Sequence, residues 1–216
     1  MIGLVDYGAG NLTSVKKALT ALGAEFTVPA TPDDCAGASG LIVPGVGHFS
    51  ATTALGEPWR DAIGHAVRVG TPLLGICVGM QWLFEGSEEA PTVPGLGVLD
   101  GTCQLLYGDT PARLKIPHVG WNALESPVGP QDTDPADPEP AAFRGRLLAG
   151  LPPNPYVYFT HSFAAPVTGD CVASTTHAEC FAAAVERDLV FGVQFHPEKS
   201  SDAGLRILRN YLELCV

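Results

Sequence analysis

Two short segments of the chain carry residue types capable of nucleophilic chemistry. Cys77 lies in a Gly-Ile-Cys-Val-Gly segment, residues 75–79, and far downstream His196 and Glu198 flank a single proline. A cysteine attacks an acyl carbon readily when an imidazole serves as its base and a carboxylate orients that imidazole. The two segments are remote in the sequence, so only folding can join them. The residue types therefore predict a Cys-His-Glu triad.

The residues around Cys77 predict a sharp strand-to-helix turn. An apolar strand over residues 72–76 leads to Cys77, and a helix is expected from about Val78. Backbone amides at a helix N-terminus favour a thiolate over a thiol. Glycines two residues before and after a nucleophile leave room for such an elbow. The alternative is a buried, unreactive cysteine beside glycines that let a helix pack closely.

The His-Pro-Glu segment predicts how the histidine is oriented. A residue before proline favours extended geometry, and residues i and i+2 of an extended chain face the same side. Glu198 is therefore expected to hold one imidazole nitrogen of His196 while the other nitrogen faces Cys77. In the alternative reading, the histidine merely ends a strand and Glu198 caps the next helix near Ser200.

A third segment, Pro-Gly-Val-Gly at residues 44–47, follows an apolar strand. Its two glycines allow backbone N–H groups to approach a substrate closely. We expect Gly47 to supply one donor of an oxyanion hole and the amide of Val78, directly after the nucleophile, to supply the other. The segment lacks the Gly-Lys-Ser/Thr ending of a phosphate loop.

The order of the expected elements predicts one α/β domain of the flavodoxin-like, doubly wound type. Apolar strands alternate with amphipathic helices in the first half, which indicates a mainly parallel central sheet covered on both faces. The expected strands are residues 2–7, 24–28, 40–43 and 72–76. The expected helices are residues 12–22, capped by Asn11, then 59–69 and a third from residue 78. The turn after residue 43 is placed at Pro44 and Gly45.

The second half predicts additional antiparallel strands. They are expected at residues 97–106, 116–124, 156–164, 171–175, 181–186 and 190–195. Asp188 suits a hairpin between the last two strands, and a final helix at 205–214 could be capped by Ser200 or Ser201. Residues 127–140, rich in Pro, Asp and Gly, are expected to form a mobile acidic loop insertion.

Composition limits the classes of partner. The 216 residues carry a net charge of −11, which argues against nucleic acid or an anionic membrane surface as a partner. The six cysteines form no C-x-x-C pair, and neither a signal segment nor an apolar run of membrane-spanning length is evident, so we expect a cytoplasmic protein with reduced thiols. No histidines or cysteines occur at close paired spacings, so we expect no metal site and no cofactor.

Together these segments resemble the class I (triad) glutamine amidotransferases, and within that family most closely the glutaminase subunits of imidazole glycerol phosphate synthase. The matching motifs are Val-Asp-Tyr-Gly-Ala-Gly-Asn at 5–11, Pro-Gly-Val-Gly-His-Phe at 44–49, Gly-Ile-Cys-Val-Gly-Met-Gln at 75–81, Phe-Glu-Gly-Ser-Glu-Glu at 84–89, His-Val-Gly-Trp-Asn at 118–122, Tyr-Phe-Thr-His-Ser at 158–162, and residues 192–200. The resemblance implies a single amidotransferase domain over residues 1–216. It also implies hydrolysis of glutamine to glutamate and ammonia, and a heterodimer with a cyclase subunit that receives the ammonia for histidine biosynthesis.

The resemblance also implies a role for each matching residue. Cys77 would be the nucleophile, His196 its base and acid, and Glu198 the orienting carboxylate. The residues expected to bind glutamine are Gly45, Gln81, Glu89, Ser162 and Phe163. The residues expected to contact the cyclase are Asn11, Trp121, Tyr158 and Lys199. A free subunit of this family is a poor glutaminase, and reorientation of the Val46-Gly47 peptide would switch it on when the partner holds its nucleotide substrate.

Three other readings remain open. One is the glutaminase of a different amidotransferase, such as those feeding anthranilate synthase or pyridoxal phosphate synthesis. Another is a binding module that keeps the fold without turnover. A third is a cysteine peptidase on a similar sheet, which residues 81 and 89 disfavour because their polar side chains suit a free amino acid.

Overall fold

The computed structural model describes residues 1–107, 114–127 and 143–215. A seven-stranded sheet with the order β10-β11-β12-β4-β3-β1-β2 forms its centre. The strands are β1 (Ile2–Leu4), β2 (Phe26–Thr27), β3 (Gly40–Gly45), β4 (Leu73–Cys77), β10 (Cys171–His177), β11 (Glu179–Arg187) and β12 (Val190–Val193). The strands β2-β1-β3-β4-β12 are parallel to one another. Strand β11 pairs antiparallel with β12, and β10 pairs antiparallel with β11. This is the strand order of flavodoxin-like sheets and confirms the predicted fold class.

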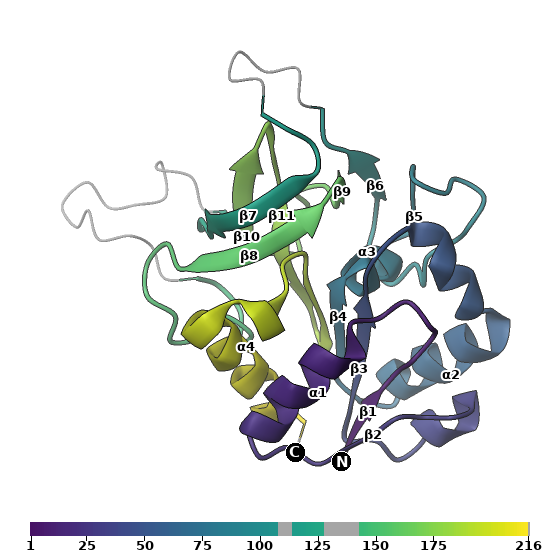
Figure 1. Cartoon of the computed structure of the whole chain (residues 1–216). Coiled ribbons are helices and arrows are strands. Elements are labelled where there is room, and N and C mark those ends of the chain that lie inside the picture. Colours follow the sequence, from purple (N-terminus) through teal and green to yellow (C-terminus); the bar gives the residue numbers. More distant parts are fainter. Residues whose placement is uncertain (108–113, 128–142, 216) are drawn as a thin grey trace.

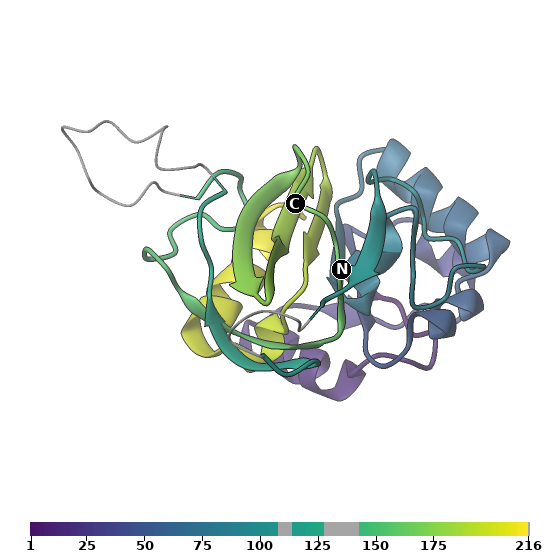
Figure 2. The same ribbon diagram turned by 90° about the horizontal axis from the view of Figure 1, so that it is seen from above.

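Helices cover both faces of the sheet. They are α1 (Leu12–Ala21), α2 (Glu57–Arg68), α3 (Val78–Leu83) and α4 (Ser201–Glu213). Figures 1 and 2 show α1 and α4 on one face and α2 on the opposite face. The sequence explains this packing: in α1, Val15, Ala18 and Leu19 are spaced at i, i+3 and i+4, and all three are buried against the sheet.

Strands β3 and β4 bring the first two chemical segments together. Every residue of both strands is buried, as expected for the centre of a parallel sheet with two covered faces. Their register pairs Gly45 with Cys77, so both strands end at the same edge. The loop that follows β3 therefore lies beside the residue that ends β4.

Two smaller sheets stand over this edge. One contains β5 (Gly86–Ser87), β6 (Thr102–Leu105) and β9 (Phe163–Ala164), and the other pairs β7 (His118–Ala123) antiparallel with β8 (Tyr156–His161). In Figure 1 the β7–β8 pair lies across the upper end of the central sheet, near the ends of β3 and β4. The strands predicted in the second half are thus found, the first of them only in part, and the last of them, β12, pairs antiparallel with β11 and parallel with β4. Asp188 lies in the β11–β12 turn with φ 52°.

Several local expectations are wrong. Strand β3 continues through Pro44 and Gly45, because both pair with β4, so the turn begins two residues later than expected. The strand expected over residues 97–106 is confined to β6, and positive φ values at Gly97 and Gly101 break the stretch before it.

The expected helix caps also differ. Asn11 and Ser200 occupy the N-cap positions of α1 and α4, but neither side chain makes a capping hydrogen bond, and Ser201 is the first helical residue. The Ser200 hydroxyl instead donates to the His196 carbonyl at 2.6 Å and accepts from the Tyr158 amide at 2.9 Å. It ties the segment after β12 to strand β8.

The acidic segment expected at residues 127–140 lies outside the described residues except for Pro127. Within the described ranges, no helix combines the length and the apolar character needed to cross a membrane. All six cysteines are described, and each is a free thiol.

Candidate active site

Cys77 lies at a strained turn between β4 and α3. Its φ of 54° and ψ of −112° belong to a conformation that non-glycine residues rarely adopt. A β-carbon added to Gly75 would lie 2.6 Å from the Gly79 carbonyl oxygen, and one added to Gly79 would overlap the Val43 carbonyl oxygen. The two glycines are therefore required by close backbone contacts, and the turn is the elbow expected from the sequence.

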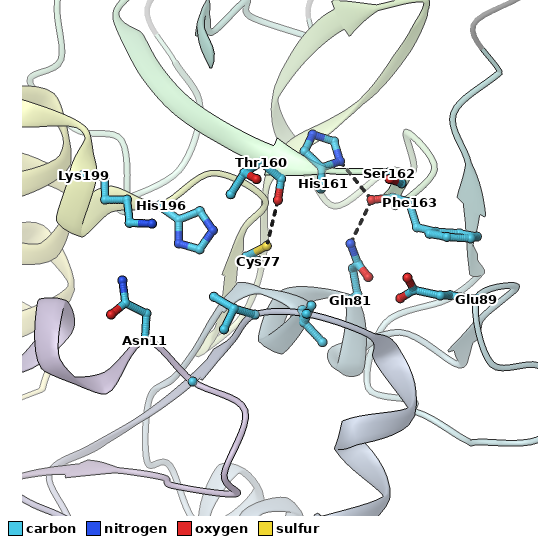
Figure 3. A pocket seen from close by; sticks show the side chains of 14 residues that line it. Asn11, Cys77, Gln81, Glu89, Thr160, His161, Ser162, Phe163, His196 and Lys199 are labelled. Carbon is cyan, nitrogen blue, oxygen red and sulfur yellow. Dashed lines mark hydrogen bonds between the residues drawn. The ribbon is translucent and has the colours of Figure 1, made fainter. Parts of the chain in front are cut away.

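His196 and Glu198 form a buried pair beside this turn. Nδ1 of His196 lies 2.9 Å from Oε1 of Glu198, and both side chains are only 1% exposed. Nε2 of His196 is buried and has no hydrogen-bond partner among the described residues. Figure 3 shows the imidazole next to the sulfur of Cys77. The fold thus brings the three groups together in the order Cys-His-Glu.

The charge state of His196 follows from this environment. Burial lowers its pKa, but the hydrogen bond to Glu198 and the negative charges of Cys77 and Glu198 favour the imidazolium more strongly, and the pKa rises to about 9. His196 therefore holds a proton near neutral pH and stands ready to act as an acid toward a leaving group.

The backbone around Glu198 is not extended as expected. Residues Pro197–Lys199 form the short 3₁₀ helix η4, and only His196 before it is extended, with φ −99° and ψ 96°. The carboxylate reaches the imidazole because the tight turn folds back toward the preceding residue, not because both face one side of a strand. The carboxylate holds the histidine and caps no helix.

A pocket of about 510 Å³ opens at Cys77, a size suited to a small molecule. It lies between the loops after β1 and β3, the helix α3 and the end of β8 (Figure 3). Its lining residues are Gly10, Asn11, Val46, Gly47, Cys77, Val78, Gln81, Glu89, Thr160, His161, Ser162, Phe163, His196 and Lys199. Ten of the fourteen site residues predicted from the sequence line this pocket, and Gly45, Trp121, Tyr158 and Glu198 do not.

Gln81 and Glu89 line the end of the pocket away from His196 (Figure 3). Nε2 of Gln81 donates to the Phe163 carbonyl at 2.8 Å, while its Oε1 is buried without a partner among the described residues. Oε2 of Glu89 accepts from the Phe49 amide at 2.7 Å. The carboxylate and the unpaired amide oxygen are both acceptors, which suits a bound ammonium group.

The loop after β3 supplies backbone to the pocket. Gly47 has φ 85°, and no atom lies within 4 Å of a β-carbon added there, so its peptide has room to turn. Val78 follows the nucleophile and also lines the pocket. Gly45 does not line it: an added β-carbon would lie 2.7 Å from the Gly79 amide nitrogen, so this glycine permits close packing of β3 on α3.

The residues expected at a partner surface fall in two places. Asn11 and Lys199 line the pocket on the His196 side. Trp121 and Tyr158 are cross-strand partners on β7 and β8, with ring centroids 6.1 Å apart, and Trp121 is 52% exposed. The Lys199 ammonium lies 5.8 Å from the Tyr158 ring centroid and connects the two groups.

The structure adds residues that the sequence did not single out. Gln194 is fully buried, and its Nε2 lies 3.6 Å from the Cys77 sulfur. The hydroxyl of Tyr7 is buried without a partner among the described residues, and burial together with the nearby Cys77 raises its pKa well above the ordinary value. A signal for Gln194 was present: it is a polar residue in an otherwise apolar strand segment, and buried polar residues are informative.

An elbow cysteine at the edge of a doubly wound sheet, next to a His-Glu pair, defines a class of hydrolytic enzyme, and comparison with known proteins agrees. The model of the family "Glutamine amidotransferase class-I" matches residues 3–214, and the chain belongs to this family of glutaminase-type enzymes. A solved structure described as a glutamine amidotransferase aligns over 99% of this chain and 98% of its own, with a TM-score of 0.71 at 21% identity. PurLQS from Thermotoga maritima aligns over 98% and 97% with a TM-score of 0.69 at 19% identity. At such identities these two likenesses show the fold alone.

More similar relatives narrow the match. The imidazole glycerol phosphate synthase subunit HisH of Gloeobacter violaceus is 44% identical over 98% of this chain and 88% of its own length. The HisH subunit of Thermococcus kodakarensis is 40% identical over 99% of this chain and its entire length.

Proposed function

We propose that this chain is the glutaminase subunit of an imidazole glycerol phosphate synthase. It hydrolyses glutamine to glutamate and ammonia and delivers the ammonia to a cyclase subunit. The observation that carries the proposal is the buried His196–Glu198 pair beside Cys77, in a pocket with acceptors for an amino acid. Similarity to HisH subunits over nearly the full chain supports a cyclase subunit as the partner and histidine biosynthesis as the pathway.

The pocket holds glutamine by its α-amino end and directs its side-chain amide toward the nucleophile. The α-ammonium group of glutamine is held by the Glu89 carboxylate and by Oε1 of Gln81, which has no other donor among the described residues. Backbone around Ser162 and Phe163 completes that end of the pocket. The side-chain amide then extends toward Cys77.

The first half of the reaction forms a thioester. The thiolate of Cys77 attacks the amide carbon, and the carbon–oxygen double bond becomes an oxyanion held by the amides of Gly47 and Val78. The C–N bond then breaks, and the protonated His196 donates its proton to the departing nitrogen, which leaves as ammonia. A histidine whose pKa is raised to about 9 holds that proton near neutral pH.

The second half returns the enzyme to its starting state. The now neutral His196 accepts a proton from water, and the resulting hydroxide attacks the thioester carbon. The C–S bond breaks, glutamate leaves, and the sulfur departs as a thiolate beside the reprotonated imidazole. Glu198 keeps the ring in one orientation through both halves by accepting from Nδ1.

The partner surface is the outer face of β7 and β8 together with Lys199 and Asn11. Three side chains of this strand pair, Val119, Trp121 and Tyr156, are 58%, 52% and 62% exposed, an unusual density of apolar surface on two short strands. Ammonia must travel dry to stay unprotonated, so an interface that covers the pocket on the Lys199 side is the natural exit. The subunits meet in the cytoplasm, where the free thiols of this chain remain reduced.

Coupling to the partner acts on the loop after β3. The amide of Val46 donates to the Ala9 carbonyl at 2.6 Å, which fixes the Gly45–Val46 peptide, while the conformationally free Gly47 leaves the next peptide room to turn. Cyclase binding with its nucleotide substrate turns the Val46-Gly47 peptide so that its N–H faces the oxyanion.

The test separates glutamine hydrolysis from the synthesis that uses the ammonia. The chain is co-purified with a cyclase subunit, and synthesis is assayed with glutamine or with ammonium as the nitrogen source. Replacing Cys77 with alanine should abolish glutamine-dependent synthesis and leave ammonium-dependent synthesis intact. Loss of both activities, or retention of both, would contradict the proposed division of labour.

A further inference from the structure

The side chain of Gln194 has no place in the mechanism above, although it contacts the nucleophile. It follows β12, is 0% exposed, and directs Nε2 at the Cys77 sulfur from 3.6 Å. We propose that Gln194 is a catalytic hydrogen-bond donor that stabilises the thiolate form of Cys77. This inference rests on the proposed function only in taking Cys77 as the nucleophile.

The direction of the Gln194 amide is fixed by its neighbours. The Phe163 carbonyl can only accept, and it receives hydrogen bonds from Nε2 of Gln81 at 2.8 Å and Nδ1 of His161 at 2.9 Å. The same Nε2 of Gln81 lies 3.1 Å from Oε1 of Gln194 and donates its second hydrogen there. Because Oε1 of Gln194 is engaged as an acceptor, the N–H₂ group must face the sulfur.

Two histidines anchor the other end of this chain of hydrogen bonds. Since Nδ1 of His161 donates to Phe163, its Nε2 must accept, and it lies 3.1 Å from Nδ1 of His118. Burial lowers the pKa of His118 to about 3 and that of His161 to about 4. Both rings therefore stay neutral near neutral pH, so the donor order does not reverse.

The two states of the sulfur meet different partners. Among the described residues, the protonated thiol of Cys77 donates to the Thr160 carbonyl at 4.0 Å, whereas a thiolate accepts from Gln194 at 3.6 Å. A hydrogen bond made to the charged form of a group favours that form. The other titratable groups near the sulfur are His196, from the segment after β12, and Tyr7, from the loop after β1. Among the described residues neither makes a hydrogen bond to the sulfur. The Gln194 amide does not titrate, so its donor remains in place whatever the protonation state of His196.

The test measures thiolate reactivity directly. Alkylation of Cys77 by iodoacetamide is followed by peptide mass spectrometry from roughly pH 5 to pH 10 in wild type, Gln194→Met and Gln194→Leu. At neutral pH both variants should react about tenfold more slowly, with the whole profile moved to higher pH, as expected for loss of a charge-assisted hydrogen bond. The exposed Cys180 in the same sample is the internal control, and its profile should not move.

An unchanged Cys77 profile in a folded variant would overturn the inference, even if glutaminase activity fell. Thermal unfolding establishes which variants are folded. If neither variant folds, NMR spectra of wild type and Cys77→Ala provide the test. The side-chain amide resonances of Gln194 should then move with pH in wild type but not in Cys77→Ala. Identical behaviour in the two proteins would equally overturn it. Alkylation requires no glutamine, so failure of the glutaminase proposal would leave this result interpretable.

Discussion

Gly79 in α3 lies so close to Val43 in β3 that a β-carbon at residue 79 would overlap the Val43 carbonyl oxygen. The contact is backbone against backbone, so no side chain can move aside. It draws the start of α3 onto β3 and thereby holds Cys77 in its strained turn.

Replacing Gly79 with alanine should therefore lower the free energy of unfolding by about 3 kcal/mol, the upper range for overpacking a buried site. Glutaminase activity should fall as well, because the elbow must open. Chemical denaturation measures the first effect. Gly169→Ala is the matched control, since no atom lies within 4 Å of its added β-carbon. Equal stability of the two variants would contradict the packing argument.

The protonation of His196 makes stability depend on pH. Its pKa rises from 6.5 in the unfolded chain to about 9 in the fold. A raised pKa stabilises the fold fully below the unfolded value, and this stabilisation is lost as the pH rises through about 9. The difference in free energy of unfolding between wild type and His196→Asn should therefore shrink by about 3 kcal/mol between these pH values.

Denaturation of both proteins across this range checks the expectation. NMR titration of His196 in Glu198→Gln should show a lower pKa than in wild type, because one of its two stabilising partners is lost. A pH-independent difference in stability, or an unchanged His196 titration, would show that the pair does not act in this way.

Glu89 should govern affinity for glutamine more than turnover. Glu89→Gln removes the charge but keeps an acceptor for the Phe49 amide, so the loop stays in place. Losing a charged contact to the substrate ammonium should raise KM about 10-fold to 100-fold with a smaller change in kcat. The neighbouring Glu88 is exposed and does not line the pocket, so Glu88→Gln should behave as wild type. An equal effect of both substitutions would mean that the ammonium is bound elsewhere.

Trp121 should anchor the cyclase. Its side chain is half exposed on β7 and packs edge-on against Tyr158, as expected of an aromatic residue that awaits a partner. Trp121→Ala should weaken binding of the cyclase at least tenfold in a titration, with little effect on the stability of the isolated chain. Val69, 66% exposed at the end of α2 and away from the β7–β8 pair, provides the control substitution Val69→Ala. Similar affinities for the two variants would place the interface on another face.

The sequence predicted the central sheet well because its strands are apolar throughout and end in glycine-containing loops. It also predicted the meeting of Cys77, His196 and Glu198, since elbow glycines and a His-Pro-Glu segment carry chemistry in their residue types. The polar Gln194 stood out in an apolar segment, but the direction of its side-chain amide could not be predicted, because it depends on a hydrogen-bond chain through Gln81 and the Phe163 carbonyl. These contacts join segments that sequence spacing does not relate.

The same limit explains the local errors. Proline and glycine at positions 44 and 45 suggested a turn, but pairing with β4 keeps both in strand β3. The hydroxyl of Ser200 was expected to cap α4, yet the His196 carbonyl and the Tyr158 amide provide better partners. In both cases tertiary contacts outweigh the local preference of the residue.

The most direct test of the account asks whether Cys77 attacks a glutamine-like carbon in this pocket. The complex with the cyclase is treated with an electrophilic ketone analogue of glutamine and mapped by mass spectrometry. We predict one covalent adduct on Cys77, formed more slowly in His196→Asn and suppressed by excess L-glutamine. Adducts confined to the exposed Cys180, or labelling of Cys77 that glutamine does not compete with, would contradict the account.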